Sequence, residues 1–414
     1  MQICNRKSRS QTTPMIKDGS ALRTEFLSKK LDLVREAMRE DEIDLWITFT
    51  REGNPDPVSV DLRLENAVWK AAALLDADGG MNAIVGGFDA EAVKQSGVYD
   101  SVHGYGKEGH VPKLVEHLKK SKPKTIAINT SADYGFSDGL TPGMLGYLKK
   151  ALAKAGGRKK KLVSAEDLVI ALRAKLIPEE VELMKRAVEE CESVFRVAEQ
   201  DIIKVGRTDK EIHEMFKTEV RNRNLELSWG EDHCPAVVIG NDVFAHSGYS
   251  GRTLEDGDLI HFDFGVKYGG YCSDLQRVYY VGKSSPSESV RKLFRVTKDA
   301  TDAGVDAIRA GVKAYLVDKA TRDSVIASGY PEFLHGTGHP IARATHEIGP
   351  HIGPRWRERY GQSMEKKLIP NMVVTIEPSV VGEDGTMNIE REILVTEKGF
   401  ESFSTPEEDL YLLG

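Results

Sequence analysis

Histidines are concentrated in one short stretch of this chain, FLHGTGHPIARATHEIGPH, which covers residues 333–351. The 414-residue sequence has 11 histidines, and four of them lie here. The glycines and prolines of the stretch would break a regular helix, so the imidazoles cannot form one face of an amphipathic helix. Imidazole is a general acid or base near neutral pH and a common metal ligand. The four candidates for this chemistry are His335, His339, His346 and His351.

Two aspartates lie on a predicted β-hairpin, HFDFGVKYGGYCSDLQRVYYV, which covers residues 261–281 and turns at its YGG tripeptide. A hairpin centred between residues 268 and 269 would set Asp263 directly opposite Asp274. Opposed side chains have Cβ atoms about 5 Å apart, so two unpaired carboxylates there would repel each other. A divalent cation, or a pair of them, removes that repulsion. Two solvent-facing aspartates are the alternative, and the spacing alone favours it.

Two glutamates lie in apolar contexts typical of buried strands: Glu377 in MVVTIEPSVV and Glu390 in MNIEREILVT. A buried glutamate costs roughly several kcal/mol unless it is paired or bound to a metal. Each of them alone could equally be a core residue in a salt bridge. Combined with Asp263, Asp274 and one histidine of the 333–351 stretch, they make a set of oxygen and nitrogen ligands without a thiolate. Such a set suits Mn, Co, Fe(II) or Zn in a site for two metals.

These residues, in the order Asp, Asp, His, Glu, Glu, resemble the metal ligands of the pita-bread metallopeptidases. The family includes methionine aminopeptidase, aminopeptidase P, prolidase and the metal-free creatinase. The strings that carry the resemblance are DFGVKYGGYCSD, HGTGH, TIEP and IEREILVT, and it covers roughly residues 176–396. The resemblance implies an α+β pita-bread catalytic domain at the C-terminal side. The chain before it resembles, more weakly, the α/β N-terminal domain with a mixed sheet of prolidase, aminopeptidase P and creatinase.

The resemblance also implies a role for each ligand, position by position. Asp263 would chelate one metal, and His339 and Glu377 would bind the other. Asp274 and Glu390 would bridge both metals. A hydroxide between the two metals would be the nucleophile, since two metals lower the pKa of bound water toward neutrality, and Glu377 would also shuttle protons. The expected cofactor is two divalent ions, with Mn first and Co, Zn or Fe as alternatives.

Three histidines are implied as substrate-site residues by the same resemblance. His335 and His346 would lie on either side of the substrate, and His246 in VFAHSG would be the third. Their imidazoles would hold the scissile carbonyl and the developing tetrahedral oxyanion. A structural role is the alternative for each of them taken singly, whereas His233 and His261 are interpreted as structural.

Several positions depart from the family pattern. Pro340 stands where the family usually has a glycine after HGTGH. Asn388 stands two residues before the final ligand, where the family usually has an arginine. The 377–390 segment is shorter than in typical prolidases and lacks their tyrosine-containing run. In relatives this arginine and tyrosine help to organise the site and the substrate, so the departures bear on turnover and substrate choice but remove no metal ligand.

The elements that must position these residues are expected in two domains. Apolar residues at helical spacing over 22–42 are followed by strand-like segments, from IDLWITF to TIAIN, that alternate with helices, which indicates an α/β domain with a mixed sheet. Pro178 then opens a long helix, and the chain becomes strand-rich before helices return over 287–328. We therefore expect a disordered lead-in over 1–15, an α/β domain over 16–170 and a pita-bread domain over 171–414.

Composition argues against several other classes. A net charge of -7 and a pI near 6.0 argue against a nucleic-acid-binding face. The four cysteines form no CxxC pair, so neither a disulfide scaffold nor a thiolate metal site is expected. No apolar run reaches the roughly 18 residues of a membrane span and no secretory signal is recognised, so we expect no membrane association and a cytoplasmic protein. HEIGPH lacks the HExxH spacing of a zincin, and GYSG lacks the GxSxG of a nucleophile elbow.

The expected function is that of an Xaa-Pro dipeptidase, similar to prolidase, which acts on small peptides with proline in the second position. An Xaa-Pro aminopeptidase acting on longer peptides is the nearest alternative, because the two activities differ in loops that block or admit the C-terminal side of the peptide. A metal-free hydrolase like creatinase is a further alternative, although creatinase lacks the metal-binding carboxylates. Because the family's arginine is missing, a non-catalytic peptide-binding scaffold is also an alternative. A homodimer is expected by resemblance alone.

Overall fold

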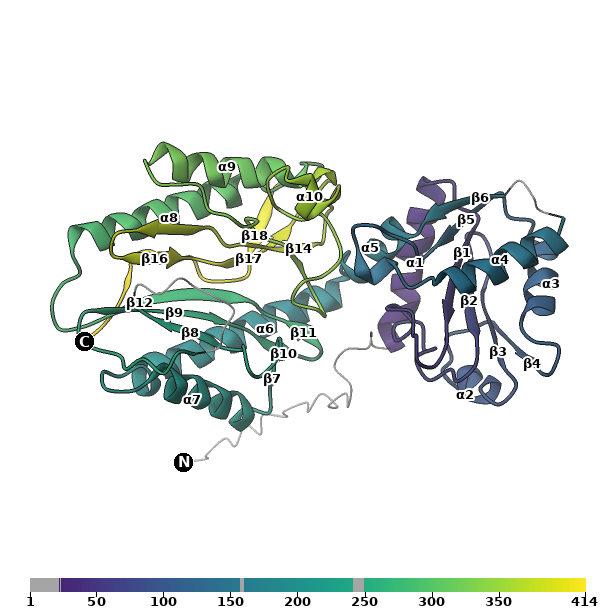
Figure 1. Cartoon of the computed structure of the whole chain (residues 1–414), viewed down its shortest axis with the longest axis horizontal. Helices are drawn as coiled ribbons and strands as arrows, with labels where there is room; N and C mark the ends of the chain where they lie inside the picture. Colours follow the sequence, from purple (N-terminus) through teal and green to yellow (C-terminus); the bar gives the residue numbers. More distant parts are fainter. Residues whose placement is uncertain (1–21, 23, 157–159, 241–248) are drawn as a thin grey trace, which may run out of the picture.

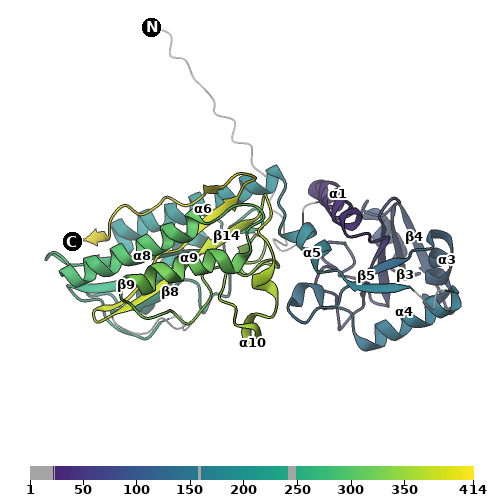
Figure 2. The same cartoon turned by 90° about the horizontal axis from the view of Figure 1, so that it is seen from above.

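The computed structural model describes residues 22, 24–156, 160–240 and 249–414. These residues form two lobes that lie side by side (Figures 1 and 2). The N-terminal lobe runs from α1 (Thr24–Glu40) to α5 (Glu166–Arg173), and the C-terminal lobe begins with α6 (Pro178–Val197). The predicted lead-in over 1–15 lies outside the described residues, and the predicted domain boundary near residue 170 stays a prediction.

The N-terminal lobe is built on a six-stranded sheet with the strand order β4-β3-β2-β1-β5-β6. Strand β1 pairs antiparallel with β2 and parallel with β5, so the predicted mixed sheet is confirmed. The elements of this lobe besides α1 and α5 are β1 Leu45–Thr50, β2 Ala71–Asp76, β3 Met81–Gly86, α2 Ala90–Gln95, β4 Ser101–Tyr105, α3 Val111–Ser121, β5 Thr125–Ile128, η1 Gly135–Ser137, α4 Pro142–Lys154 and β6 Lys161–Ser164.

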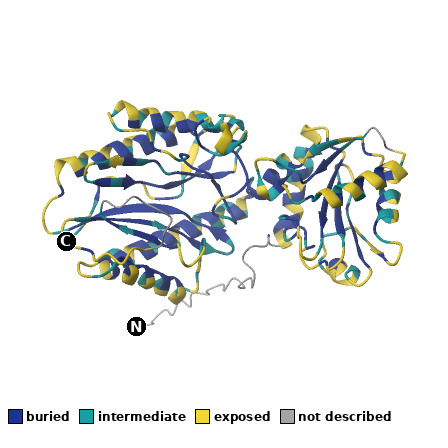
Figure 3. Cartoon of the chain, viewed as in Figure 1, coloured by how far each residue is buried: buried dark blue, intermediate teal, exposed yellow. Residues whose placement is uncertain are grey.

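Helices cover both faces of this sheet. Leu45, Ile47 and Phe49 of β1 pack in one cluster with α3 and α4. Trp46 points to the opposite face and packs with α1 and α5. A strand that is buried on both faces has no need of a polar side, which explains the nearly continuous apolar run of LWITF. Figure 3 shows the strands buried between helices whose outer surfaces are exposed.

The C-terminal lobe contains two four-stranded sheets, in the orders β19-β12-β9-β8 and β13-β14-β17-β18. Tyr279 of β12 faces a core shared with α6 and α7, whereas Val278 and Tyr280 face a second core shared with α8. The elements after α6 are η2 Ala198–Ile202, α7 Asp209–Asn222, β7 Glu226–Leu227, β8 Ala236–Ile239, β9 Asp258–Phe264, β10 Val266–Tyr268, β11 Tyr271–Cys272, β12 Leu275–Val281, α8 Glu288–Asp306, α9 Ala314–Ala327, β13 Pro340–Ile341, α10 Arg357–Tyr360, η3 Ser363–Glu365, β14 Val373–Ile376, β15 Ser379–Gly382, β16 Gly385–Asn388, β17 Arg391–Val395, β18 Phe400–Ser402 and β19 Tyr411–Leu413.

The predicted helix start at Pro178 is confirmed, and the starts of α4, α6 and α7 each have a local cause. Pro142 is in the first turn of α4, where the side chain of Thr141 caps the helix, and Pro178 opens α6. Thr208 caps α7 and forms a capping box with Glu211. None of the helices within the described ranges is long and apolar enough to cross a membrane.

The hairpin of β9 and β12 is present, but its register differs from the prediction. Asp263 lies opposite Gln276, so the prediction that Asp263 lies directly opposite Asp274 is wrong. The hairpin turns at Gly269 and Gly270, which have positive φ angles of 58° and 90°. A centre one residue earlier would force a tyrosine into a conformation that its Cβ disfavours. The shift moves the cross-strand partner by two residues, so Asp274 stays on the same face as a diagonal neighbour of Asp263.

The histidine-rich stretch is irregular, as predicted. It contains the short strand β13 and an isolated bridge between Gly338 and Ile352. Gly338 passes so close to β14 that a Cβ there would lie 1.9 Å from the carbonyl oxygen of Thr375. Only glycine fits this position of HGTGH, and the close approach places His339 against β14, where its N–H donates to Oγ1 of Thr375 at 3.1 Å.

Candidate metal centre

Three of the predicted ligands converge although they lie far apart in the sequence. One ligand atom from each of Asp274, His339 and Glu390 lies within 4.8 Å of the other two, and all three residues are buried. Each residue directly precedes a strand, namely β12, β13 and β17. The starts of three strands from two sheets therefore bring two carboxylates and an imidazole into one buried cluster.

Glu377 joins this cluster from the end of β14. Its Oε1 lies 3.5 Å from Nε2 of His339. Ile376 and Arg391 are the last paired residues of β14 and β17. Glu377 follows the first of them and Glu390 precedes the second, so the two glutamates face each other just beyond the paired strands. Both were expected inside strands; they lie at strand ends, where the backbone is freer to turn a carboxylate into the cluster.

Asp263, near the end of β9, is the fifth residue of the predicted set of metal ligands. It lies in β9 on the same face as Asp274 and is partly buried, and its carboxylate acts electrostatically on those of Glu377 and Glu390. The five residues predicted as metal ligands therefore lie around one point, although one pair of them is diagonal rather than directly opposed.

The electrostatics of the cluster call for positive charge. Burial raises the pKa of all four carboxyl groups, and neighbouring carboxylates raise it further for Asp274, Glu377 and Glu390. Burial and a neighbouring imidazole lower the pKa of His339. A divalent cation reverses the preference of the carboxyl groups for protons, and the neutral form of imidazole is the one that binds a metal.

Several carboxyl oxygens in the cluster are buried without a hydrogen-bond partner in the described part of the chain: Oδ1 of Asp263, Oδ1 of Asp274 and both Oε atoms of Glu390. A buried oxygen of this kind is costly unless something satisfies it. Four carboxylates and one imidazole form a hard donor set that suits Mn, Co, Fe(II) or Zn. The residues therefore fit a centre for divalent metals.

Gln276 belongs to this site but was not among the predicted residues. Its Nε2 donates to Oε2 of Glu377 at 2.9 Å, and its Oε1 lies 3.2 Å from Nε2 of His261. Burial lowers the pKa of His261 to about 3, so this imidazole is neutral and can donate to the amide oxygen. The hairpin register is the signal that identifies Gln276, since a turn centred on the two glycines makes it the cross-strand partner of Asp263.

Replacing Gln276 by methionine is expected to weaken metal binding about 10- to 100-fold, because partners that orient a metal ligand have effects of this size. Methionine has a similar volume but cannot donate to Glu377, so the carboxylate loses its orientation while the core stays filled. Competition with a chromophoric chelator measures the affinity. The matched control is the same substitution at the exposed Gln95 of α2, which should leave the affinity unchanged; equal affinities for both variants would contradict this role for Gln276.

The predicted substrate-site histidines have different outcomes. The ring of His346 lies against that of His339, with 4.2 Å between the ring centroids. His335 is held by hydrogen bonds at both ring nitrogens: Nδ1 lies 2.7 Å from the carbonyl oxygen of Gly336, and Nε2 lies 2.8 Å from Oγ of Ser379. His246 lies outside the described residues. The catalytic roles of all three stay predictions.

Asn388, which stands in place of the family's arginine, acts on His335 through Ser379. Its Nδ2 donates to Oγ of Ser379 at 2.6 Å. The serine hydroxyl can then donate its own hydrogen to Nε2 of His335, which leaves the hydrogen on Nδ1 to bind the carbonyl oxygen of the next residue. This chain of donors selects one neutral tautomer of His335, so the position before the final ligand still contributes to the site without an arginine.

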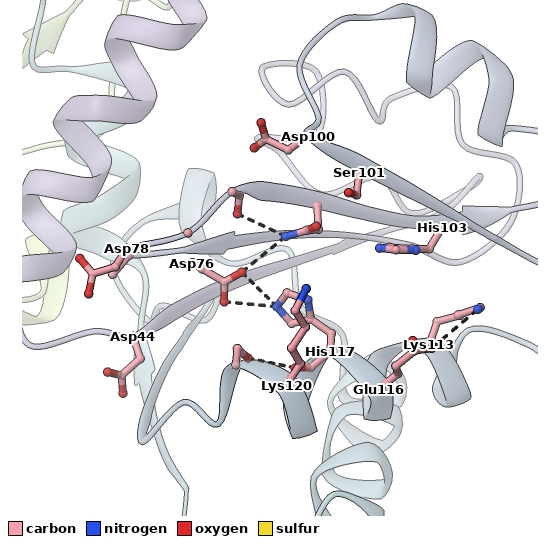
Figure 4. Close-up of a pocket in the computed structure, with 15 residues that line it drawn as sticks. Asp44, Asp76, Asp78, Asp100, Ser101, His103, Lys113, Glu116, His117 and Lys120 are labelled. Atoms are coloured by element: carbon pink, nitrogen blue, oxygen red, sulfur yellow. Dashed lines mark hydrogen bonds and ion pairs between the residues drawn. The ribbon is translucent and has the colours of Figure 1, made fainter.

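A cavity of about 620 Å³ lies elsewhere, on the N-terminal lobe (Figure 4). Its acidic side chains have ordinary partners: Asp76 lies 3.2 Å from Nε2 of His117, and Asp100 accepts the backbone N–H of Met81 at 2.7 Å. Among the described residues, the only group of three or more His, Cys, Asp or Glu with metal-binding geometry is the one in the C-terminal lobe. Ligand geometry, rather than cavity size, therefore identifies the candidate site.

Comparisons with known proteins agree with this assignment. Residues 182–397 match metallopeptidase family M24. The uncharacterized peptidase YqhT of Bacillus subtilis is 30% identical over 254 residues, which are 61% of this chain and 68% of that protein. An Xaa-Pro dipeptidase of Pyrococcus furiosus is 28% identical over 273 residues, which are 65% of this chain and 74% of that protein.

Two solved structures extend the match to both lobes. An Xaa-Pro dipeptidase from Bacillus anthracis superposes with a TM-score of 0.69 and 25% identity, over 94% of this chain and 100% of that one. An X-Pro aminopeptidase from Thermotoga maritima has a TM-score of 0.66 and 24% identity, over 92% and 99% of the two chains. The fold is thus an α/β N-terminal domain followed by an α+β pita-bread domain. Since the family match covers more than half of the sequence and includes the whole cluster, the chain belongs to metallopeptidase family M24.

Proposed function

We propose that this protein is an Xaa-Pro dipeptidase that uses two divalent metal ions. The observation that carries the proposal is the buried convergence of Asp274, Glu390 and His339, with Asp263 and Glu377 beside them and carboxyl oxygens that have no partner among the described residues. The residues that would hold the metals are Asp263, Asp274, His339, Glu377 and Glu390. Bound metals would lower the pKa of water toward neutrality and polarise the scissile carbonyl.

The surrounding residues have roles in the proposal that follow from their contacts. The ring of His346 lies against that of His339, so it is next to the cluster. It would hold the substrate carbonyl and its developing negative charge. Glu377, oriented by Gln276, would take a proton from the attacking water and pass it to the leaving nitrogen. His335, whose Nε2 is hydrogen-bonded to Ser379, would contact the substrate on the side opposite His346.

The choice between a dipeptidase and an aminopeptidase depends on the C-terminal side of the peptide. The relatives include Xaa-Pro dipeptidases and an X-Pro aminopeptidase, so the family alone supports either activity. We favour the dipeptidase because an Xaa-Pro dipeptidase matches 65% of this chain, whereas two putative Xaa-Pro aminopeptidases match 54% and 39% of it, although at 30% and 34% identity. Manganese, a homodimer and a cytoplasmic location are kept as parts of the proposal.

Product analysis by chromatography tests the proposal. Mn-loaded protein is given Ala-Pro, Ala-Pro-Ala and Ala-Ala together, and a chelated sample serves as the control. The expected result is release of proline from Ala-Pro, with the tripeptide intact and no product in the chelated sample. Cleavage of the tripeptide alone would move the assignment to an Xaa-Pro aminopeptidase. Activity that survives chelation would favour a creatinase-like hydrolase, and no product from any peptide would favour a binding role.

A further inference from the structure

A buried cluster of four charged side chains joins the two lobes next to the candidate metal centre. Asp61 lies between β1 and β2, and Arg173 ends α5. Arg343 and Glu347 lie in the 340–347 segment, the part of the histidine-rich stretch that follows His339. All four side chains are at most 5% exposed. The N-terminal lobe thus reaches the segment that carries His346 through charged groups rather than through apolar contacts alone.

The four side chains form a chain of ion pairs with defined geometry. One carboxylate oxygen of Asp61 accepts from Nη1 of Arg343, and the other accepts from Nη1 of Arg173 at 2.8 Å. Arg173 turns its Nε and Nη2 to the two carboxylate oxygens of Glu347, at 2.7 and 2.9 Å. Burial alone would raise the pKa of Asp61, but the two guanidiniums outweigh it and lower the pKa to about 2. Asp61 is therefore a carboxylate that holds both arginines.

Such a cluster is poorly explained by stability alone. Desolvating four charges is expensive, and apolar side chains of similar volume often stabilise a protein at least as well as a buried ion pair. Bidentate pairing of guanidinium and carboxylate does, however, fix position and orientation more narrowly than apolar packing does. The arrangement is therefore suited to holding a segment in one geometry.

The segment that is held carries His346. Arg343 and Glu347 lie on either side of this histidine in the sequence, and the N–H of Glu347 donates to the carbonyl oxygen of Pro340 at 2.9 Å, which closes the segment into a loop. His339, at the start of the loop, is anchored separately by its backbone contacts with Thr375 of β14. The ion pairs can therefore act on His346 without acting on the metal ligand.

We propose that Asp61, in the N-terminal lobe, is a positioning residue that sets the place of the His346 ring against His339 by fixing the 340–347 loop. The inference rests on the proposed function only for its kinetic consequence. The N-terminal lobe then contributes to transition-state geometry in the C-terminal lobe, although Asp61 touches neither the cluster of ligands nor the substrate.

A second buried ion pair between the lobes offers a matched control. Nζ of Lys30 in α1 lies 2.9 Å from Oε2 of Glu180 in α6, and both side chains are fully buried. Lys30 also donates to the carbonyl oxygen of Lys175. These partners lie outside the 340–347 loop. Lys30→Met and Asp61→Asn thus each remove one buried charge from the same interface, but only the second removes a contact with the loop.

The test compares these two variants with the wild-type protein by hydrogen–deuterium exchange and by kinetics. In Asp61→Asn we expect exchange of the 341–348 amides to rise about tenfold or more, since the loop then keeps only its contacts within the C-terminal lobe, such as the N–H of Cys272 on the carbonyl oxygen of Ala342, and opens more often. We expect kcat to fall about 10- to 100-fold with little change in KM, as for a displaced group that acts in the transition state. Metal affinity should be unchanged. Lys30 acts on Arg343 and Asp61 only electrostatically, and its hydrogen bonds are with residues outside the loop, so in Lys30→Met the changes in loop exchange and in kcat should both be much smaller than in Asp61→Asn.

Equal effects of the two variants on the loop and on kcat would overturn the proposal, and so would loss of metal affinity in Asp61→Asn, which would mean that the ion pairs hold the ligand. If Asp61→Asn does not fold, Asp61→Asn combined with Arg343→Met replaces it. The double variant leaves Arg173 paired with Glu347, so the buried cluster stays neutral, and the same rise in loop exchange is expected. Loop exchange needs no activity, so an inactive wild-type protein would contradict the proposed function and leave this test intact.

Discussion

Asp274→Asn is expected to abolish hydrolysis and, in metal-free protein, to raise thermal stability. The carboxylate of Asp274 is buried among three others, and burial followed by the neighbouring carboxylates raises its pKa. A neutral amide of the same shape removes that repulsion, and each pKa unit of relief corresponds to about 1.4 kcal/mol. A metal centre contributes roughly several kcal/mol to the transition state, and each 1.36 kcal/mol is about tenfold in rate, so activity should fall at least about a thousandfold.

The unfolding temperatures of the two proteins should rank in opposite orders with and without metal. With chelator, Asp274→Asn should unfold at a higher temperature than wild type, whereas with Mn it should unfold at a lower one, because only wild type gains stability from the bound ions. Differential scanning calorimetry of both proteins in both conditions measures the four midpoints. Asp299→Asn, at an exposed position of α8, is the control and should follow wild type throughout. Wild-type activity in Asp274→Asn would refute its role as a ligand.

Metal-free protein is expected to lose stability more steeply than metal-loaded protein as the pH rises from about 7 to 8.5. The folded state holds protons on carboxyl groups whose pKa values are raised: burial raises that of Asp263 to about 7, and burial with neighbouring carboxylates raises those of Asp274, Glu377 and Glu390. The unfolded chain has already released these protons near pH 4. The stability that depends on them is complete below that pH and is lost as the pH rises through the raised values, by up to about 1.4 kcal/mol per pH unit for each group.

The chosen pH range separates these carboxyl groups from the buried histidines. His339 has a lowered pKa in the folded state, so its contribution to stability is present above the unfolded value of 6.5 and is lost as the pH falls. It adds no slope above about pH 7. Bound metal displaces the protons from the cluster and removes the cluster's part of the slope, whereas Asp56 in the N-terminal lobe, whose pKa burial raises to about 7, contributes a slope in both conditions. Urea unfolding at several pH values, with and without Mn, gives both slopes; parallel slopes would contradict the charge assignment of the cluster.

Local patterns in the sequence predicted most of the elements and the four carboxylates of the cluster, and the family resemblance selected His339 among the four histidines. The start of α6 at Pro178 depends on a residue type that suits a first helical turn, and this signal is read directly from the chain. The hairpin register was missed by one residue at its centre, because the choice between YG and GG in the turn depends on backbone angles rather than on composition. Gln276 was missed for the same reason, since its place in the site follows from the register.

Contacts between distant segments could not be predicted from one sequence. Asp61 and Arg343 are 282 positions apart, and neither lies in a motif that would connect them. The contact of Asn388 with Ser379 depends on the pairing of β15 with β16, which the shortened 377–390 segment did not reveal. Both cases concern residues that position a histidine rather than bind a metal. The residue types thus indicated the metal ligands, whereas the residues that position the histidines were identified only from the three-dimensional structure.

The most direct test of the account is the metal content of the protein after loading with Mn and removal of unbound ions, measured by plasma mass spectrometry on wild type and Asp274→Asn side by side. The five converging ligands predict two Mn ions per wild-type chain and loss of metal from the variant. One ion or none per wild-type chain, or an equal content in the two proteins, would contradict the two-metal centre on which the proposed peptidase activity rests.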